Sequence, residues 1–209
     1  MPPTQVRPDS FTRSARKAQI VAAAIDVIAE VGFAQASIRR IAERVGIAMS
    51  AVLYHFGTKD NLVDAIVEHM YRSMIAQVAP AIEAEDTAAG KLDAYIRSSI
   101  AYFGNNRVAL KALASLNTFY VPADGRRFEE LGLGPDIAEQ LAALDPAPIL
   151  AAGRRDGEFT EFPLRSTAVA LRGAVNGVVE MVLHVPGYDA GGYAEDLIDI
   201  FGRIVSTPR

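Results

Sequence analysis

Positively charged and hydrogen-bonding side chains gather in a short stretch from Ser37 to Lys59. Guanidinium, ammonium and hydroxyl groups are donors that bind phosphate oxygens, and a helix N-terminus adds to the attraction. Arg39 and Arg40 stand in the first turn of a predicted helix, where cations oppose the helix dipole and stability alone would favour acids. We therefore expect at least one of the pair to contact phosphate rather than form a plain solvated face.

Two short helices joined by a tight turn must position these side chains. Apolar residues recur at i, i+3, i+4 and i+7 over Ile38–Val45, which predicts one buried helical stripe. Gly46 should end that helix, because glycine tolerates positive φ best. A second helix is predicted over about Ala48–Phe56, with Val52 and its last residue buried. This arrangement is a helix-turn-helix, in which the second helix enters the major groove of DNA.

The outward face of that second helix has few groups that can read base edges. Ser50 and Tyr54 can donate or accept hydrogen bonds, His55 is left open, and Ala51 could pack against a thymine methyl. Recognition of a DNA sequence should then depend also on Arg39 or Arg40, on the N-terminal arm or on DNA shape. The predicted DNA-contacting residues are Arg39, Arg40, Met49, Ser50, Ala51, Tyr54, His55 and Lys59.

Charge is distributed unevenly along the chain. The formal net charge is −4 over 209 residues, yet residues 1–59 carry +4 and the remainder −8. This asymmetry indicates a basic working end on an acidic body. The sequence has no cysteine, which excludes disulfides and thiolate metal sites and is typical of a reducing compartment. Because we find neither an apolar signal core nor a run that could span a membrane, we expect a cytoplasmic protein.

Helical spacing dominates the rest of the chain, and no convincing alternating strand occurs, so the predicted fold class is all-α. We expect a flexible N-terminal arm (1–11), a helix-turn-helix DNA-binding domain (12–58) and a C-terminal effector-binding and dimerisation domain (59–209). The first helix should start near Thr12 or Ser14. A long helix after Thr58 should kink or end at Pro80. Further helices are predicted near 91–103, 107–120, 136–144, 146–152, 166–184 and 193–205.

The stretch Gly46–Leu62, GIAMSAVLYHFGTKDNL, resembles the DNA-binding signature of the tetracycline-repressor (TetR/AcrR) family, roughly GVSKGTLYYHFKSKEEL. The preceding SIRRIAERV is similar to that family's TVRDIAEAA. The resemblance implies a homodimer whose all-helical C-terminal domain binds an effector and alters DNA affinity. The chain departs from the family at 48–51, where AMSA replaces the common SKGT and removes a capping hydroxyl and a phosphate-seeking ammonium.

No group of residues suits catalysis, a cofactor or a metal. His55, His69 and His184 lack ligand spacing, and the sequence contains no phosphate-binding loop, dinucleotide fingerprint or GxSxG motif. We therefore expect a protein that is not an enzyme and needs no cofactor.

Aromatic and polar residues of the middle helices are candidates for an effector pocket, although ordinary core or interface packing is the stronger reading for any one of them. Asn117 stands out, because a buried amide on an apolar helix needs a partner and a ligand can supply it. A mostly apolar pocket would take a mostly apolar effector. The candidates are Tyr71, Met74, Tyr95, Tyr102, Phe103, Asn117, Tyr120 and Asn176.

Two glycines, Gly173 and Gly177, lie four residues apart on one helical face, where each costs about 1 kcal/mol of helix propensity. Close approach of another helix would explain them. The family resemblance places dimerisation on the last two helices, so we expect these glycines, Leu197 and Phe201 at the dimer interface.

Together these expectations describe a homodimeric transcriptional regulator, a repressor that a small-molecule effector releases from a palindromic operator in double-stranded DNA. Two alternatives stay open at this point. One is a regulator without a small-molecule effector, and the other is a helical enzyme or ligand carrier with a vestigial DNA-binding end.

Overall fold

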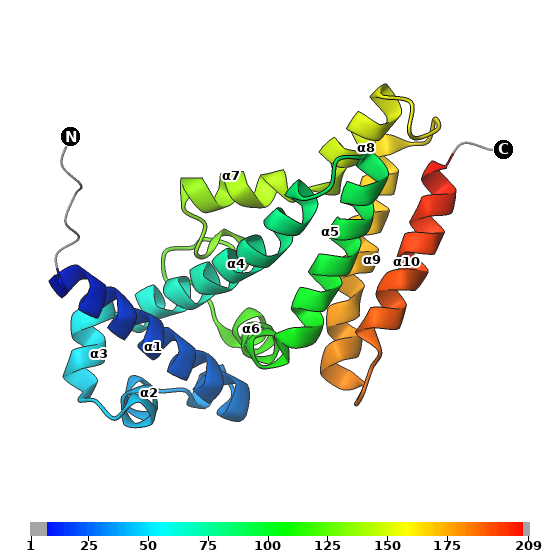
Figure 1. Cartoon of the computed structure of the whole chain (residues 1–209). Coiled ribbons are helices and arrows are strands. Elements are labelled where there is room, and N and C mark those ends of the chain that lie inside the picture. Colours follow the sequence, from blue (N-terminus) through cyan, green and yellow to red (C-terminus); the bar gives the residue numbers. More distant parts are fainter. Residues whose placement is uncertain (1–7, 207–209) are drawn as a thin grey trace, which may run out of the picture. The chain divides into compact units, whose positions relative to one another are not determined.

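The computed structural model describes residues 8–206, which form helices and no strand, so the all-α prediction is confirmed (Figure 1). The chain begins with α1 (Pro8–Val31), a 3-10 turn (Phe33–Gln35), α2 (Ile38–Val45) and α3 (Met49–Phe56). Next come α4 (Lys59–Glu83), α5 (Ala88–Asn105), α6 (Arg107–Phe119) and a second 3-10 turn (Phe128–Glu130). The last four helices are α7 (Pro135–Ala143), α8 (Pro146–Arg155), α9 (Leu164–His184) and α10 (Ala190–Val205).

The helices group into two compact units that do not follow chain order. The first contains the residues up to Met70 together with Lys111–Gly132, and the second contains Tyr71–Leu110 and the residues from Leu133 onward. Helices α4 and α6 therefore contribute residues to both units. The predicted functional division after residue 58 stays a prediction.

The core of the first unit follows from helical spacing in α1. Ile20, Ala24, Val27 and Ile28 are all buried, as the apolar periodicity predicts. The predicted start of this helix was wrong, because α1 begins at Pro8 rather than near residue 12. Proline suits the first helical turn, where its missing N–H would have no acceptor. Of the predicted flexible arm, residues 1–7 lie outside the described chain.

Lys111–Gly132, here called the returning segment, belongs to this first unit although forty residues of the other unit precede it. The Ser115 hydroxyl accepts a hydrogen bond from the backbone N–H of Phe33 at 2.9 Å, and the Tyr120 hydroxyl donates to Asp60 at 3.0 Å. The Arg126 guanidinium binds the Asp64 carboxylate through two nitrogens, at 3.2 and 2.8 Å. These contacts join the segment to α4 and to the residues after α1.

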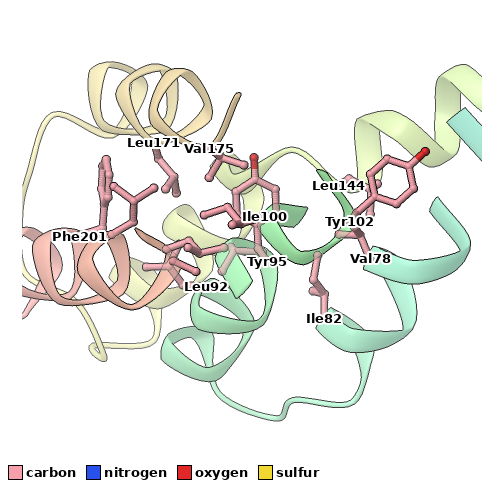
Figure 2. Close-up of a cluster of buried hydrophobic side chains, with 14 of the residues drawn as sticks. Val78, Ile82, Leu92, Tyr95, Ile100, Tyr102, Leu144, Leu171, Val175 and Phe201 are labelled. Carbon is pink, nitrogen blue, oxygen red and sulfur yellow. The ribbon is translucent and has the colours of Figure 1, made fainter. Parts of the chain in front are cut away.

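Helices α5, α9 and α10 lie side by side in the second unit and enclose its core (Figures 1 and 2). Figure 2 shows Leu92 and Ile100 of α5 beside Leu171 and Val175 of α9 and Phe201 of α10. Ser99 and Thr167 are the buried polar residues of the described chain, so this core is almost wholly apolar.

Two residues of α10 that were predicted at the dimer interface are buried within the single chain instead. Leu197 and Phe201 are each only 5% exposed and belong to the core of the second unit. Periodicity could not separate them from Ile200 and Ile204, because apolar residues lie on both sides of this helix. Ile200 and Ile204 are the exposed ones, at 50% and 45%.

Two observations about helices differ from what the sequence predicts. Helix α4 continues one turn past Pro80 to Glu83, so the helix does not end at this proline. Helix α9 is long and apolar enough, by length and composition alone, to cross a membrane. It nevertheless carries Arg165 and Arg172, and its buried side chains, among them Leu171 and Val175, pack into the core, which is the pattern of a core helix.

Candidate nucleic-acid interface

Local capping explains why α2 and α3 form where the sequence predicts them. The Ser37 hydroxyl accepts a hydrogen bond from the Arg40 N–H at 3.2 Å and caps the start of α2. Gly46 ends α2 in the left-handed conformation, with φ 75° and ψ 36°, as predicted. Ala48 precedes α3 without a side-chain cap, which confirms the loss of a capping hydroxyl at this position.

Helix α3 is anchored on one side and free on the other. Val52 and Phe56 are buried in the first unit, as predicted. On the outer side Met49 is 51% exposed, Leu53 38% and Tyr54 72%. Ser50 is also exposed, and Ala51 is half-buried. The outer face therefore offers two hydroxyl groups and several apolar atoms, as the sequence predicts for a surface poor in base-reading groups.

Arg39 and Arg40 have different surroundings although both side chains are exposed. The Arg39 Nε donates to Glu43 at 2.8 Å, one turn along α2. Arg40 forms no ion pair in the described part of the chain. Of the two guanidinium groups beside the N-terminus of α2, that of Arg40 is therefore the one available to an external anion.

Tyr54 is held by an aromatic and cationic neighbourhood that the sequence does not reveal. The Arg13 guanidinium carbon of α1 lies 5.6 Å from the centre of the Tyr54 ring, and the His55 ring meets the same ring edge-on at 5.4 Å. A cation over an aromatic face is attracted by the ring quadrupole. Arg13 thus stands beside the outer face of α3 and extends its positive surface. No spacing rule connects residues 13 and 54, so only the fold could show this contact.

Lys59 is placed differently from the other predicted phosphate contacts. Its ammonium lies 4.1 Å from the centre of the Phe33 ring and 3.5 Å from the Phe33 carbonyl oxygen. Burial lowers the pKa of this ammonium. Lys59 therefore has a packing role within the first unit, and its contact with phosphate stays a prediction.

The predicted effector residues do not form one cluster. Tyr95, Tyr102 and Phe103 are buried in the core of the second unit, and Tyr71 and Met74 pack against it. Burial, with a smaller effect of Asp145, raises the pKa of Tyr95 to about 12, so its phenol stays neutral.

The other three lie elsewhere. Tyr120 is buried in the first unit, and Asn117 and Asn176 are exposed. The choice of Asn117 assumed a buried amide, and that assumption was wrong.

An all-helical chain with an anchored, outward-facing second helix falls in the helix-turn-helix class of proteins. Residues 20–66 match the sequence model of "Bacterial regulatory proteins, tetR family". The chain is 28% identical over 107 residues to the HTH-type transcriptional regulator BetI of Ectopseudomonas mendocina. That alignment covers 50% of this chain and 53% of BetI. It is 44% identical over 69 residues to the HTH-type transcriptional repressor Rv3405c of Mycobacterium tuberculosis. That alignment covers 33% of this chain and 37% of Rv3405c.

Solved structures share the fold over nearly the whole chain. The regulator FadR from Bacillus subtilis, crystallised with stearoyl-CoA, aligns with a TM-score of 0.72 and 20% identity over 88% of this chain and 96% of FadR. A tetR-family regulatory protein from Rhodococcus aligns with a TM-score of 0.70 and 22% identity over 92% and 98% of the two chains. The chain spans about half of the length of BetI, the first of the curated relatives that it matches. The family match covers residues 20–66, and over these residues the chain is similar to the TetR family of bacterial regulatory proteins.

Proposed function

We propose that this chain is a homodimeric transcriptional repressor that binds a palindromic operator in the cytoplasm. The observation that carries the proposal is α3, whose inner side is buried at Val52 and Phe56 while Met49, Ser50 and Tyr54 face outward. Such a helix can enter a major groove without unfolding its own domain. Arg40 of α2 and Arg13 of α1 supply cations for the flanking phosphates.

Selection from random double-stranded DNA tests DNA reading directly. Two-fold symmetry should enrich a palindrome whose half-site centres lie about 34–36 Å apart, or a multiple of that distance. Tyr54→Ala serves as the matched variant, because Tyr54 is 72% exposed and its loss leaves the core intact. The variant should bind the enriched site more weakly. Failure of the wild-type protein to enrich any palindrome at moderate salt would contradict the proposal.

The proposed dimer uses the exposed side of α9 and α10. Gly173 and Gly177 face open space, because a Cβ added at either would meet no atom of the described chain within 4 Å. Val169, Met181, Ile200 and Ile204 are the large apolar side chains exposed on the same two helices. A second copy would cover this apolar surface, and the two glycines would let its helices approach closely.

The proposed effector is a small, largely apolar molecule that binds in the second unit. The support is the composition of its core, in which Ser99 and Thr167 are the buried polar residues within residues 12–206. Because one structural neighbour is described with stearoyl-CoA, long-chain acyl-CoA thioesters belong among the compounds to test. A true effector should raise the melting temperature and weaken operator binding, typically by about 1–3 kcal/mol of coupling. If a compound saturates the protein and leaves operator affinity unchanged, it is not the releasing effector.

A further inference from the structure

Phe33, in the 3-10 turn between α1 and α2, is contacted by two segments that lie far from it in the sequence. Lys59, the first residue of α4, places its ammonium 4.1 Å from the centre of the Phe33 ring and 3.5 Å from the Phe33 carbonyl oxygen. Just after α6, the Tyr120 ring meets the Phe33 ring edge-on, with centres 5.3 Å apart and planes at 80°. The Phe33 N–H donates to Ser115 at 2.9 Å. The ring, the N–H and the carbonyl of Phe33 are therefore all engaged.

A hydrogen bond between the two contacting segments completes this arrangement. The Tyr120 hydroxyl donates to Asp60, which directly follows Lys59, at 3.0 Å. Burial, followed by the hydrogen bond to Asp60, raises the pKa of Tyr120, so the phenol keeps the proton that it donates. Contacts thus run from Phe33 to Lys59, along the chain to Asp60, and through Tyr120 back to Phe33. These four residues, here called the Phe33 clamp, all lie in the first unit.

The position of Lys59 is unfavourable for a cation unless Phe33 compensates for it. A positive charge at the first residue of a helix opposes the helix dipole. The Phe33 ring face and carbonyl oxygen supply the negative partial charge that stabilises the ammonium there. Reaching an external phosphate would take the ammonium away from both of these groups. The contacts of Lys59 therefore favour a role inside the first unit.

The Phe33 clamp holds the chain immediately after the outward-facing helix. Helix α3 ends at Phe56, and Lys59 begins α4 three residues later. Gly57 between them has a φ of 75°, and its N–H donates to a carbonyl in the last turn of α3 at 2.7 Å, so the connection is short and defined. Because so few residues intervene, a shift of Lys59 would move the C-terminal end of α3.

We propose that Lys59 supports operator binding as a positioning residue, which is held against Phe33 and fixes the end of α3, and not as a phosphate contact. The proposal rests on the proposed DNA-binding function and replaces the phosphate contact that the sequence predicts for this lysine. Tyr120 is a second positioning residue, because it holds Phe33 and Asp60 together.

The salt dependence of operator binding separates the two roles of Lys59. Loss of a phosphate contact reduces the magnitude of the slope of log K against log salt by about 0.9, whereas loss of a positioning contact releases no counterion and leaves the slope unchanged. Lys59→Met removes the ammonium and keeps an apolar side chain. We expect it to weaken binding to the enriched palindrome about threefold to tenfold, with a slope change below about 0.3 in fluorescence anisotropy. Arg40→Gln is the control, and in the same assay it should change the slope by about 0.9.

A double-mutant cycle shows whether Lys59 acts through Phe33. Phe33→Leu removes the aromatic face and keeps an apolar side chain. In the Phe33→Leu background, Lys59→Met should weaken operator binding by less than about a further twofold, because the cation–π contact is already absent. Urea denaturation of the same four proteins, without DNA, should show a coupling of at least about threefold in the unfolding equilibrium constant.

Tyr120→Phe tests the second positioning residue without altering any charge. It removes the hydroxyl that binds Asp60 and keeps the ring that meets Phe33, so it should weaken operator binding about threefold to tenfold at an unchanged salt slope. Thr118→Val is the matched control. The Thr118 hydroxyl donates to the Ala114 carbonyl of its own helix, so its loss should change operator binding less than about twofold.

Four results would overturn the proposal. These are a slope reduced by about 0.9 in Lys59→Met, wild-type operator affinity in folded Lys59→Met, additive effects of Lys59→Met and Phe33→Leu, and wild-type operator affinity in Tyr120→Phe. Melting temperatures show whether each variant is folded. A wild-type protein that enriched no palindrome would instead contradict the repressor function, and the cycle in urea would still decide whether the Phe33 clamp exists in solution.

Discussion

Adjacent arginines at the start of α2 are expected to contribute unequally to DNA binding. Arg40 is exposed and unpaired within the described chain, whereas Arg39 already binds Glu43 at 2.8 Å. Arg40→Gln should weaken operator binding about tenfold, similarly for all sequences, and reduce the magnitude of the salt slope by about 0.9. Fluorescence anisotropy across a salt series measures both quantities.

Arg39→Gln is the matched control for this prediction. It removes the same charge from the same turn, but the Arg39 guanidinium is already engaged by Glu43, so its loss should weaken phosphate binding less at moderate salt. Equal losses from the two variants would mean that the pair acts only through its summed charge.

Gly132 is predicted to be one of the most sensitive positions of the first unit. Its φ is +64°, and a Cβ there would lie 2.4 Å from the Glu68 backbone nitrogen of α4. Gly132→Ala should therefore cost about 1 kcal/mol for the backbone conformation and about 1–3 kcal/mol more for the overlap. Urea denaturation gives the change in the free energy of unfolding.

A substitution at Gly125 distinguishes the cost of the backbone conformation from the cost of the steric overlap. Its φ is +77°, but nothing lies within 4 Å of a Cβ built on it. Gly125→Ala should therefore show the backbone cost alone. If the two variants were equally destabilised, the close approach of Gly132 to α4 would not exist in solution.

Residue-level features that depend on neighbours in sequence could be predicted well. The end of α2 at Gly46 and the burial of Val52 and Phe56 follow from helix-ending chemistry and helical spacing, and all are confirmed. The contact of Arg13 with Tyr54 and the packing of Lys59 on Phe33 could not be predicted. These pairs depend on how α1, α3 and α4 pack, which no local pattern contains.

At the scale of helices, the exposed side of α9 and α10 should control assembly. Ile200→Glu together with Ile204→Glu would place charges on an apolar surface that is 50% and 45% exposed in the single chain. We expect the double variant to stay folded and to be monomeric, with a mass of 22.4 kDa by light scattering, where the wild type shows twice that value.

Val108→Glu offers a suitable comparison. Val108 is 52% exposed and lies on α6, which is not one of the two helices of the proposed interface, so the same type of change there should leave the dimer intact. A wild-type protein that runs as a monomer at micromolar concentration would contradict the proposed assembly.

Helix existence was predictable, whereas the direction that each helix faces was not. Helix α10 begins at Ala190 rather than Tyr193 and carries apolar residues on two sides, so spacing alone could not show that Leu197 and Phe201 face the core. The exposure of Asn117 on α6 has a similar cause, because the returning segment packs in the first unit through Leu116 and Tyr120 instead.

Across the whole molecule, paired carboxylates predict a loss of stability in acid. Hydrogen bonds from Arg44 lower the pKa of Glu30, the Arg126 backbone and side chain lower that of Asp124, and Arg72 lowers that of Asp136. A depressed folded-state pKa stabilises the protein above the unfolded values, 4.5 for Glu and 3.8 for Asp, and this contribution disappears as the pH falls through the folded-state values.

Urea midpoints at pH 7 and below about pH 4 should show this loss. Glu30→Gln should narrow the difference between the two midpoints, because it removes one of the titrating groups. Burial raises the pKa of Asp93, which acts in the opposite sense, so Asp93→Asn should widen the difference. A midpoint that did not change with pH would show that these exposed pairs contribute nothing measurable.

The returning segment also determines when the protein can fold during synthesis. The N–H of Gly132 donates to Asp64, 68 residues earlier, and Phe33 donates to Ser115 across 82 residues. Such distant pairings must wait until residue 132 has left the ribosome, and long loops slow folding. The helix-turn-helix is therefore completed only after a large part of the other unit has been translated. If translation ended before Gly132, the chain would contain the outward-facing helix α3. It would lack the hydrogen bond from Gly132 to Asp64 that joins the returning segment to α4.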